Sequence, residues 1–170
     1  FTDCQVPAAN LLGEPGKGFY YVMEFFNNTR IGVAAQGCGI AQGALNVATQ
    51  YAIQREAFGK PIAELQGIQF KLAEMATRAE AARLLTYKAA YLNDTGKPSP
   101  QASSMAKWFA GRAAVENADE CVQILGGMGY VDEMPAEKFY RDAKICEIYE
   151  GTKEVHKLII ARSLFGRIKG

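Results

Sequence analysis

Apolar side chains recur every three to four residues from Phe19 onward, and this period constrains the fold more than any other feature of the chain. The stripe that starts at Val22 continues to Tyr51 and predicts one long helix over residues 19–54. Similar stripes predict helices over residues 63–92, 100–125 and 151–168, with a short helix over 135–143. Glycine and proline separate the stripes, so short turns join the helices. The sequence therefore predicts an all-α fold, an antiparallel four-helix up-and-down bundle with a short extra helix.

The first 18 residues have a different character. They form a short extended segment followed by a loop that contains Gly13, Pro15 and Gly16. We expect residues 1–18 to be the tail of an upstream domain plus a connector, and residues 19–170 to form the helical bundle domain. The chain begins with phenylalanine instead of methionine, so we also expect it to be a fragment of a longer protein.

Charge and composition exclude several functions. Lys and Arg (19) nearly balance Asp and Glu (18), which argues against binding of nucleic acid or an anionic membrane through bulk charge. No stretch reaches the roughly 20 apolar residues that span a bilayer. His156 is the only histidine, so a multi-histidine site is excluded and no metal is expected. The four cysteines include no CxxC pair, which indicates free thiols in a reducing compartment.

Two groups of glycines suggest nucleotide binding, but their context does not support it. Gly13–Gly18 looks like a phosphate loop, yet Gly18 stands where such a loop needs Ser or Thr. The second group lies within a helical stripe with no strand before it and comprises Gly32, Gly37, Gly39 and Gly43. Its spacing of about one or two turns predicts that another helix approaches closely.

Two segments combine glycine with polar or aromatic residues in a way that packing alone does not require. Arg55–Ile62, with Gln66 beyond it, could place a guanidinium and a ring beside a phosphate or a heterocycle. The alternative is a solvated arginine at a helix end. Gln123–Tyr130 runs a helix into three glycines, which either bring main-chain amides to a ligand or form a C-cap and turn.

A third segment, Ile148–Thr152, places a carboxylate directly before a glycine and the predicted start of the last helix. A glutamate partly shielded by apolar neighbours suits general-base chemistry, which would make Glu150 catalytic. The alternative is a structural glutamate that complements the helix N-terminus, with Thr152 as the capping residue. We expect His156, further along the same helix, to be a surface or interface residue.

In this order, the three segments resemble the C-terminal domain of acyl-CoA dehydrogenases, the flavin enzymes of fatty-acid and amino-acid oxidation. The resemblance covers nearly the whole chain and includes Leu12–Phe19 and Tyr140–Ala143. Through Gly126–Tyr130 and Glu133–Glu137 the chain looks most similar to the short-chain, butyryl-CoA branch. The resemblance implies a C-terminal helical bundle, preceded in residues 1–18 by a remnant of the middle β-domain.

In that family a base removes a proton from the α-carbon of an acyl-CoA thioester, FAD accepts hydride from the β-carbon, and the product is the trans-2-enoyl-CoA. The position that matches the family base is Glu150. Some members carry the base on the first long helix, and the matching residue here is Thr29, which cannot act as a base. The resemblance also implies that the Glu150 amide polarises the thioester carbonyl. Because the family's other domains are missing, we expect the isolated chain to be inactive.

The resemblance assigns further residues to the two ligands. Those matched to FAD contacts are Arg55, Phe58, Gln66, Gln123, Ile124, Leu125, Gly126, Gly127, Thr152 and Glu154. Residues 123–127 are expected to contact the cofactor largely across a dimer interface. Those near the acyl-CoA substrate are Asn27, Arg30, Tyr149 and Gly151.

The resemblance also implies a homotetramer, built as a dimer of dimers, that passes electrons to electron-transfer flavoprotein in fatty acid β-oxidation. The location would be cytoplasmic in a bacterium and the mitochondrial matrix in a eukaryote. Three alternatives stay open: a non-catalytic helical interaction domain derived from the family, an acyl-CoA oxidase-like enzyme, and a nitroalkane oxidase or acyl carrier protein-directed dehydrogenase. The presence of Glu150 beside Gly151 argues against the first, because an interaction domain has no need of that carboxylate.

Overall fold

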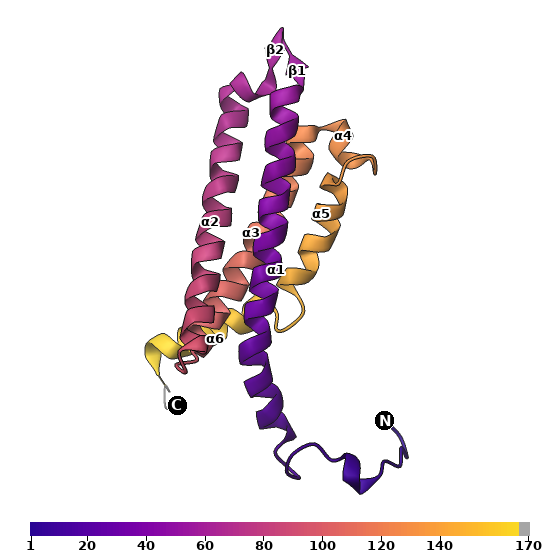
Figure 1. The fold of residues 1–170 in the computed structure, drawn as a ribbon, viewed down its shortest axis with the longest axis vertical. Helices are drawn as coiled ribbons and strands as arrows, with labels where there is room; N and C mark the ends of the chain where they lie inside the picture. The colour runs from indigo at the N-terminus through magenta and orange to yellow at the C-terminus, as the bar shows by residue number, and fades with distance from the viewer. Residues whose placement is uncertain (167–170) are drawn as a thin grey trace.

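The structure is a computed structural model that describes residues 1–166. Three long helices run side by side: α1 (Gly18–Gln54), α2 (Gln66–Asp94) and α3 (Pro100–Leu125) (Figure 1). The short α5 (Ala136–Ala143) packs on α3 and α1, and α6 (Lys153–Phe165) packs on α3 in the lower part of Figure 1. Residues 1–17 extend away from the bundle as an exposed arm. The prediction of an all-α helical bundle is confirmed.

Local chemistry sets where the long helices begin and end. The Ser99 hydroxyl accepts a hydrogen bond from the Ala102 amide at 3.2 Å, and proline occupies the first position of α3. α2 ends where Gly96 adopts a φ of +70° and the Lys97 amide donates to the Leu92 carbonyl. The last helix was predicted to reach residue 168, and its final two residues lie outside the described part of the chain.

Several short elements have no signal in the apolar pattern. β1 (Glu56–Ala57) and β2 (Lys60–Pro61) form an antiparallel hairpin in which Ala57 lies opposite Lys60. Its turn residues, Phe58 and Gly59, have φ values of +55° and +79°, as the tightest hairpin turns require. The other short elements are η1 (Ala8–Asn10), η2 (Ile62–Glu64), α4 (Gly127–Tyr130) and η3 (Lys144–Glu147).

Alanine dominates the core, so the helices approach one another closely. The buried side chains include Ala34, Ala41, Ala44, Ala48, Ala79, Ala82, Ala106, Ala110 and Ala114. A β-carbon added to Gly37 would lie 2.8 Å from the Ala110 carbonyl oxygen, and one on Gly43 would lie 3.0 Å from an aromatic ring of α5. The predicted close approach is confirmed at these two glycines. It is wrong for Gly32 and Gly39, where an added β-carbon meets nothing within 4 Å.

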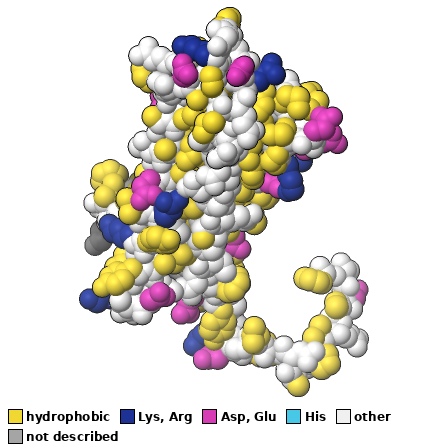
Figure 2. Space-filling view, turned by 45° about the horizontal axis from the view of Figure 1, so that its top comes forward, with side chains coloured by type: hydrophobic (Ala, Val, Ile, Leu, Met, Phe, Trp, Pro, Cys, Tyr) yellow, Lys and Arg dark blue, Asp and Glu magenta, His cyan; other side chains and the backbone are white. Residues whose placement is uncertain are grey.

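Many large apolar side chains remain on the surface (Figure 2). The exposed ones include Val22 and Phe25 of α1 and Val155, Leu158 and Phe165 of α6. His156 is instead the buried residue of α6, so its prediction as a surface or interface residue is wrong. The reason is that α6 packs through one narrow face, and His156 lies on that face. No helix of residues 1–166 is long and apolar enough to cross a membrane.

Candidate active site

The predicted base lies in a short loop between η3 and α6, residues 148–152, which we call the Glu150 turn. Thr29 Oγ1 of α1 donates to Glu150 Oε2 at 2.5 Å, a short hydrogen bond that fixes this carboxylate oxygen. Glu150 has a φ of +56° and Gly151 a φ of +99°. A left-handed conformation costs a residue other than glycine about 1–2 kcal/mol, so the surrounding structure must impose this turn.

Two buried cations lie close to the Glu150 turn. Arg30 follows Thr29 on α1 and is 6% exposed; burial lowers the pKa of Arg30, and the charge of Glu150 opposes that effect. Lys107 of α3 is 1% exposed and its Nζ donates to the Gly151 carbonyl oxygen at 2.6 Å. Burial lowers the pKa of Lys107 to about 8, so its ammonium keeps most of its charge at pH 7.

The residues predicted to lie near an acyl-CoA substrate come together around this turn. Asn27 Oδ1 accepts a hydrogen bond from Arg30 Nη1 at 3.2 Å. Tyr149 precedes the base, and its hydroxyl donates to a glutamine side chain of α1. Gly151 follows the base directly. The arrangement presents a partly buried carboxylate, held by a hydroxyl and flanked by cations, which is suited to accept a proton from a bound carbon acid.

The structural interpretation that the sequence left open for Glu150 is not supported. Thr152 is the N-cap of α6, and Glu154 is the acidic residue of its first turn. Backbone hydrogen bonding at Glu154, assisted by Thr152, lowers the pKa of Glu154. The complement to the helix N-terminus is therefore Glu154, while the Glu150 carboxylate is bound by Thr29.

Sequence reasoning missed Lys107 and misplaced His156, which also lies against the turn. A β-carbon added to Gly151 would lie 3.2 Å from His156 Nε2. A signal for Lys107 was present: it lies between Ala106 and Ala110 on the apolar stripe of α3, where a charged side chain is out of place. His156 carries no comparable signal, because it lies between Val155 and Lys157, both exposed, and no clear apolar face of α6 surrounds it.

A second group of predicted residues lies at the other end of the bundle, around the β1–β2 hairpin (Figure 1). Arg55, Phe58 and Gln66 are all exposed, and Phe58 is 92% exposed. An α-helix rises about 1.5 Å per residue, so Thr29 and Gln54 of α1 lie on the order of 40 Å apart. The structure therefore divides the predicted site residues between two ends of the bundle.

The glycine-rich segment that ends α3 belongs to the hairpin end. Gln123 is exposed, whereas the Ile124 and Leu125 side chains are buried in the core, so only their main-chain atoms could contact a ligand. The Gly126 amide donates to the Val122 carbonyl at 2.9 Å. Gly126 is therefore the C-cap of α3, the second of the two alternatives that the sequence left open, while exposed Gly127 leaves room for a close approach.

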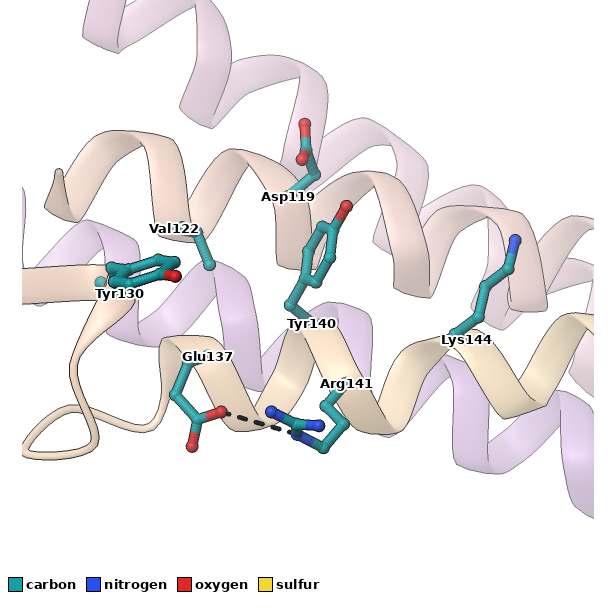
Figure 3. Close-up of a pocket in the computed structure, with 8 residues that line it drawn as sticks. Asp119, Val122, Tyr130, Glu137, Tyr140, Arg141 and Lys144 are labelled. Atoms are coloured by element: carbon teal, nitrogen blue, oxygen red, sulfur yellow. Dashed lines mark ion pairs between the residues drawn. The ribbon is translucent and has the colours of Figure 1, made fainter. Parts of the chain in front are cut away.

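A pocket of about 740 Å³ lies between the end of α3, α4 and α5 (Figure 3). Tyr130 and Tyr140 line it, as do Glu137 and Arg141, which form an ion pair with an N–O distance of 3.9 Å. None of the predicted site residues lines this pocket, so its chemistry does not bear on them. Among residues 1–166, no three His, Cys, Asp or Glu side chains are grouped as a metal site requires.

The chain is similar to known proteins over nearly its whole length. The family described as "Acyl-CoA dehydrogenase, C-terminal domain" matches residues 16–165. The chain is 56% identical, over 96% of its length, to the mitochondrial short-chain specific acyl-CoA dehydrogenase of Rattus norvegicus, and covers 40% of that protein. It is 53% identical to an acryloyl-CoA reductase (NADH) of Anaerotignum propionicum, over 98% of this chain and 42% of that protein.

A solved structure shares the fold. The butyryl-CoA dehydrogenase from Megasphaera elsdenii superposes with a TM-score of 0.92 at 49% identity, over 94% of this chain and 42% of that chain. The chain thus spans about 40% of the length of the curated relatives it matches. Together, the family match and the shared bundle show that the chain belongs to the acyl-CoA dehydrogenase family, as its C-terminal domain.

Proposed function

We propose that the chain is the C-terminal part of a FAD-dependent enzyme that dehydrogenates short-chain acyl-CoA thioesters to trans-2-enoyl-CoA in fatty acid β-oxidation. The observation that carries this proposal is the Glu150 turn, whose carboxylate accepts a hydrogen bond from Thr29 and lies close to Arg30. The similarity to a short-chain specific acyl-CoA dehydrogenase supports the proposal that the acyl chain of the substrate is short.

Within the full-length enzyme, the proton transfer would be carried by residues of this chain. Thr29 holds Glu150 Oε2, so Oε1 is the oxygen that would take the proton from the α-carbon of the thioester. The Glu150 amide would donate to the thioester carbonyl as negative charge develops there. Asn27, Arg30, Tyr149 and Gly151 would border the substrate. When bound, FAD supplies the acceptor for the hydride that leaves the β-carbon.

The hairpin end fits the phosphate and adenosine part of FAD. Arg55 offers a guanidinium fork for a phosphate, Phe58 an exposed ring and Gln66 an exposed amide. Residues 123–127 add a glutamine side chain and main-chain atoms. Because this group lies far from Glu150, one chain cannot bring both to a single flavin. We propose that the hairpin end of one chain serves the flavin of a neighbouring copy, while Thr152 and Glu154 serve their own.

The remaining parts of the proposal follow from the family. Residues 1–18 would be the end of a middle β-domain and its connector, and residues 19–170 the bundle domain. The full-length protein would form a dimer of dimers and pass electrons to electron-transfer flavoprotein, in the cytoplasm of a bacterium or the mitochondrial matrix of a eukaryote. Since the chain spans only part of its relatives, we expect it to be inactive when isolated.

A second candidate function is the reverse reaction. One relative is named an acryloyl-CoA reductase (NADH), which indicates that a similar bundle serves reduction of a 2-enoyl thioester. The same residues would then act in reverse, with protonated Glu150 giving its proton to the α-carbon. The direction would be set by the electron partner and not by the bundle.

The experiment is a substrate series on the full-length holoenzyme. Saturated C4 to C16 acyl-CoA thioesters are supplied with an artificial electron acceptor, and the trans-2-enoyl-CoA product is quantified. We expect the largest kcat/KM at C4. Activity only with NADH and a 2-enoyl-CoA would favour the reductase, and peroxide formation in air would favour an oxidase. Absence of FAD and of thioester binding would favour an interaction domain and contradict the proposal.

A further inference from the structure

A buried lysine lies directly beneath the Glu150 turn. Lys107, from the middle of α3, donates from Nζ to the Gly151 carbonyl oxygen. In the described part of the chain, this is its one hydrogen bond of good geometry, and it pairs with no carboxylate. Burying an ammonium is costly unless its donors are used. Because burial of this ammonium is costly, we infer that its hydrogen bond to the Gly151 carbonyl has a role beyond packing of the core.

His156 supports the same peptide from α6. Its side chain is 0% exposed, and its Cε1 would lie 3.3 Å from a β-carbon added to Gly151. Within residues 1–166 neither ring nitrogen has a hydrogen-bond partner of good geometry. Burial, together with the charges of Lys107 and Arg30, lowers the pKa of His156 to about 4, although backbone contacts at the turn act in the opposite direction. The ring is thus a neutral packing surface at pH 7.

The Glu150 turn is held from three helices. Thr29 of α1 binds the carboxylate, Lys107 of α3 binds the carbonyl of the next residue, and His156 of α6 packs below it. The left-handed φ of Glu150 is unfavourable for an isolated peptide, so the turn depends on these contacts. Lys107 is the one of these three residues that binds the main chain of the turn through a directional hydrogen bond.

We propose that Lys107 is a positioning residue for Glu150: by holding the Gly151 carbonyl, it keeps the base and its main-chain amide in place for proton removal. The inference rests on the proposed function of Glu150. Loss of Lys107 removes neither Glu150 nor its hydrogen-bond donor Thr29. Without Lys107, however, the main chain of the turn would shift, and the carboxylate would meet the α-carbon in a poorer geometry.

The test compares the full-length holoenzyme with its Lys107→Met variant, which keeps the length of the side chain but removes the donor. A displacement of about 1 Å can slow a chemical step by about 100-fold. We expect kcat for butyryl-CoA per bound FAD to fall about 10- to 100-fold while KM changes less than about threefold. The isotope effect with α-deuterated butyryl-CoA should increase, because proton removal becomes slower relative to the other steps.

Lys107→Gln is the second variant and serves if Lys107→Met does not fold. It keeps a polar group, but its shorter side chain stops short of Gly151, so we expect the same fall in kcat and rise in isotope effect. The matched control is Lys71→Met, which removes a partly buried lysine that binds Glu120 near the hairpin end. Its kcat should stay within about twofold of wild type even if stability falls.

Glu150→Gln in the same assay separates this inference from the proposed function. If Glu150→Gln keeps the wild-type kcat per bound FAD, Glu150 is not the base and both proposals fail. If Glu150→Gln is inactive while the Lys107 variants keep the wild-type kcat and isotope effect, the positioning role is overturned and Glu150 remains the base.

Discussion

The Glu150 turn and the tip of the β1–β2 hairpin share one local conformation: a residue other than glycine with positive φ is followed by a glycine. The φ values are +56° and +99° at Glu150 and Gly151, and +55° and +79° at Phe58 and Gly59. Their surroundings differ completely. Thr29, Lys107 and His156 hold the first turn, whereas Phe58 is almost fully exposed and a β-carbon on Gly59 would meet nothing within 4 Å.

The two turns have similar backbone conformations but differ in what holds them and in what they present. At the hairpin, Phe58 also adopts a costly positive φ, which the following Gly59 and the β1–β2 pairing accommodate, and its aromatic ring is left free for another surface. At the Glu150 turn, contacts from three helices impose the conformation and orient a carboxylate. The first arrangement suits a surface completed by a cofactor or a neighbouring copy, and the second suits a catalytic group that must be held in place.

The largest expected difference between the two turns is in stability. Gly151→Ala adds a methyl group 3.2 Å from His156 Nε2 at a φ of +99°, so we expect the free energy of unfolding to fall by about 2–4 kcal/mol. The matched control, Gly59→Ala, has a φ of +79° and open space, and should cost about 1 kcal/mol. Urea denaturation measures both, and equal losses would contradict the contrast between a packed and a free turn.

The buried His156 beside the Glu150 turn makes the stability of the chain depend on pH. The pKa of His156 is lowered from 6.5 to about 4 in the folded chain, so the unfolded chain takes up its proton first as the pH falls. Stability is therefore full above pH 6.5 and is lost as the pH falls toward 4, by up to about 3 kcal/mol. In His156→Gln this loss is absent. Denaturation curves that stay parallel for the two proteins from pH 7 to pH 4 would rule out a buried neutral histidine.

The smallest effect on stability is expected at the hairpin. Arg55→Ala removes an exposed side chain and should change the free energy of unfolding by less than about 0.5 kcal/mol. In the full-length enzyme it should weaken FAD binding about 10- to 100-fold, because the charged hydrogen bond proposed between Arg55 and a FAD phosphate would be lost. Lys60→Ala removes the same charge from the same hairpin and is the control. Equal effects of the two variants on the FAD dissociation constant would indicate general electrostatics and not a specific Arg55 contact.

The long helices could be predicted from sequence because their apolar stripes and their glycine and proline boundaries are local. The hairpin could not, because pairing over two residues leaves no periodic pattern. Glu150 was a candidate base from its place before a glycine and a helix start, but only the resemblance to a family motif favoured the catalytic interpretation over the structural one. Lys107 and His156 were missed as supports of the turn because α3 and α6 bring them together with Gly151, and local sequence does not encode that packing.

In the proposed reaction, the Glu150 carboxylate removes the proton from the α-carbon of the thioester. Stopped-flow measurement of flavin reduction by butyryl-CoA, without oxygen, in the full-length Glu150→Gln holoenzyme tests this role. We predict normal FAD content and a reduction rate lower by about three orders of magnitude or more. Reduction at the wild-type rate would contradict this role and place the base elsewhere.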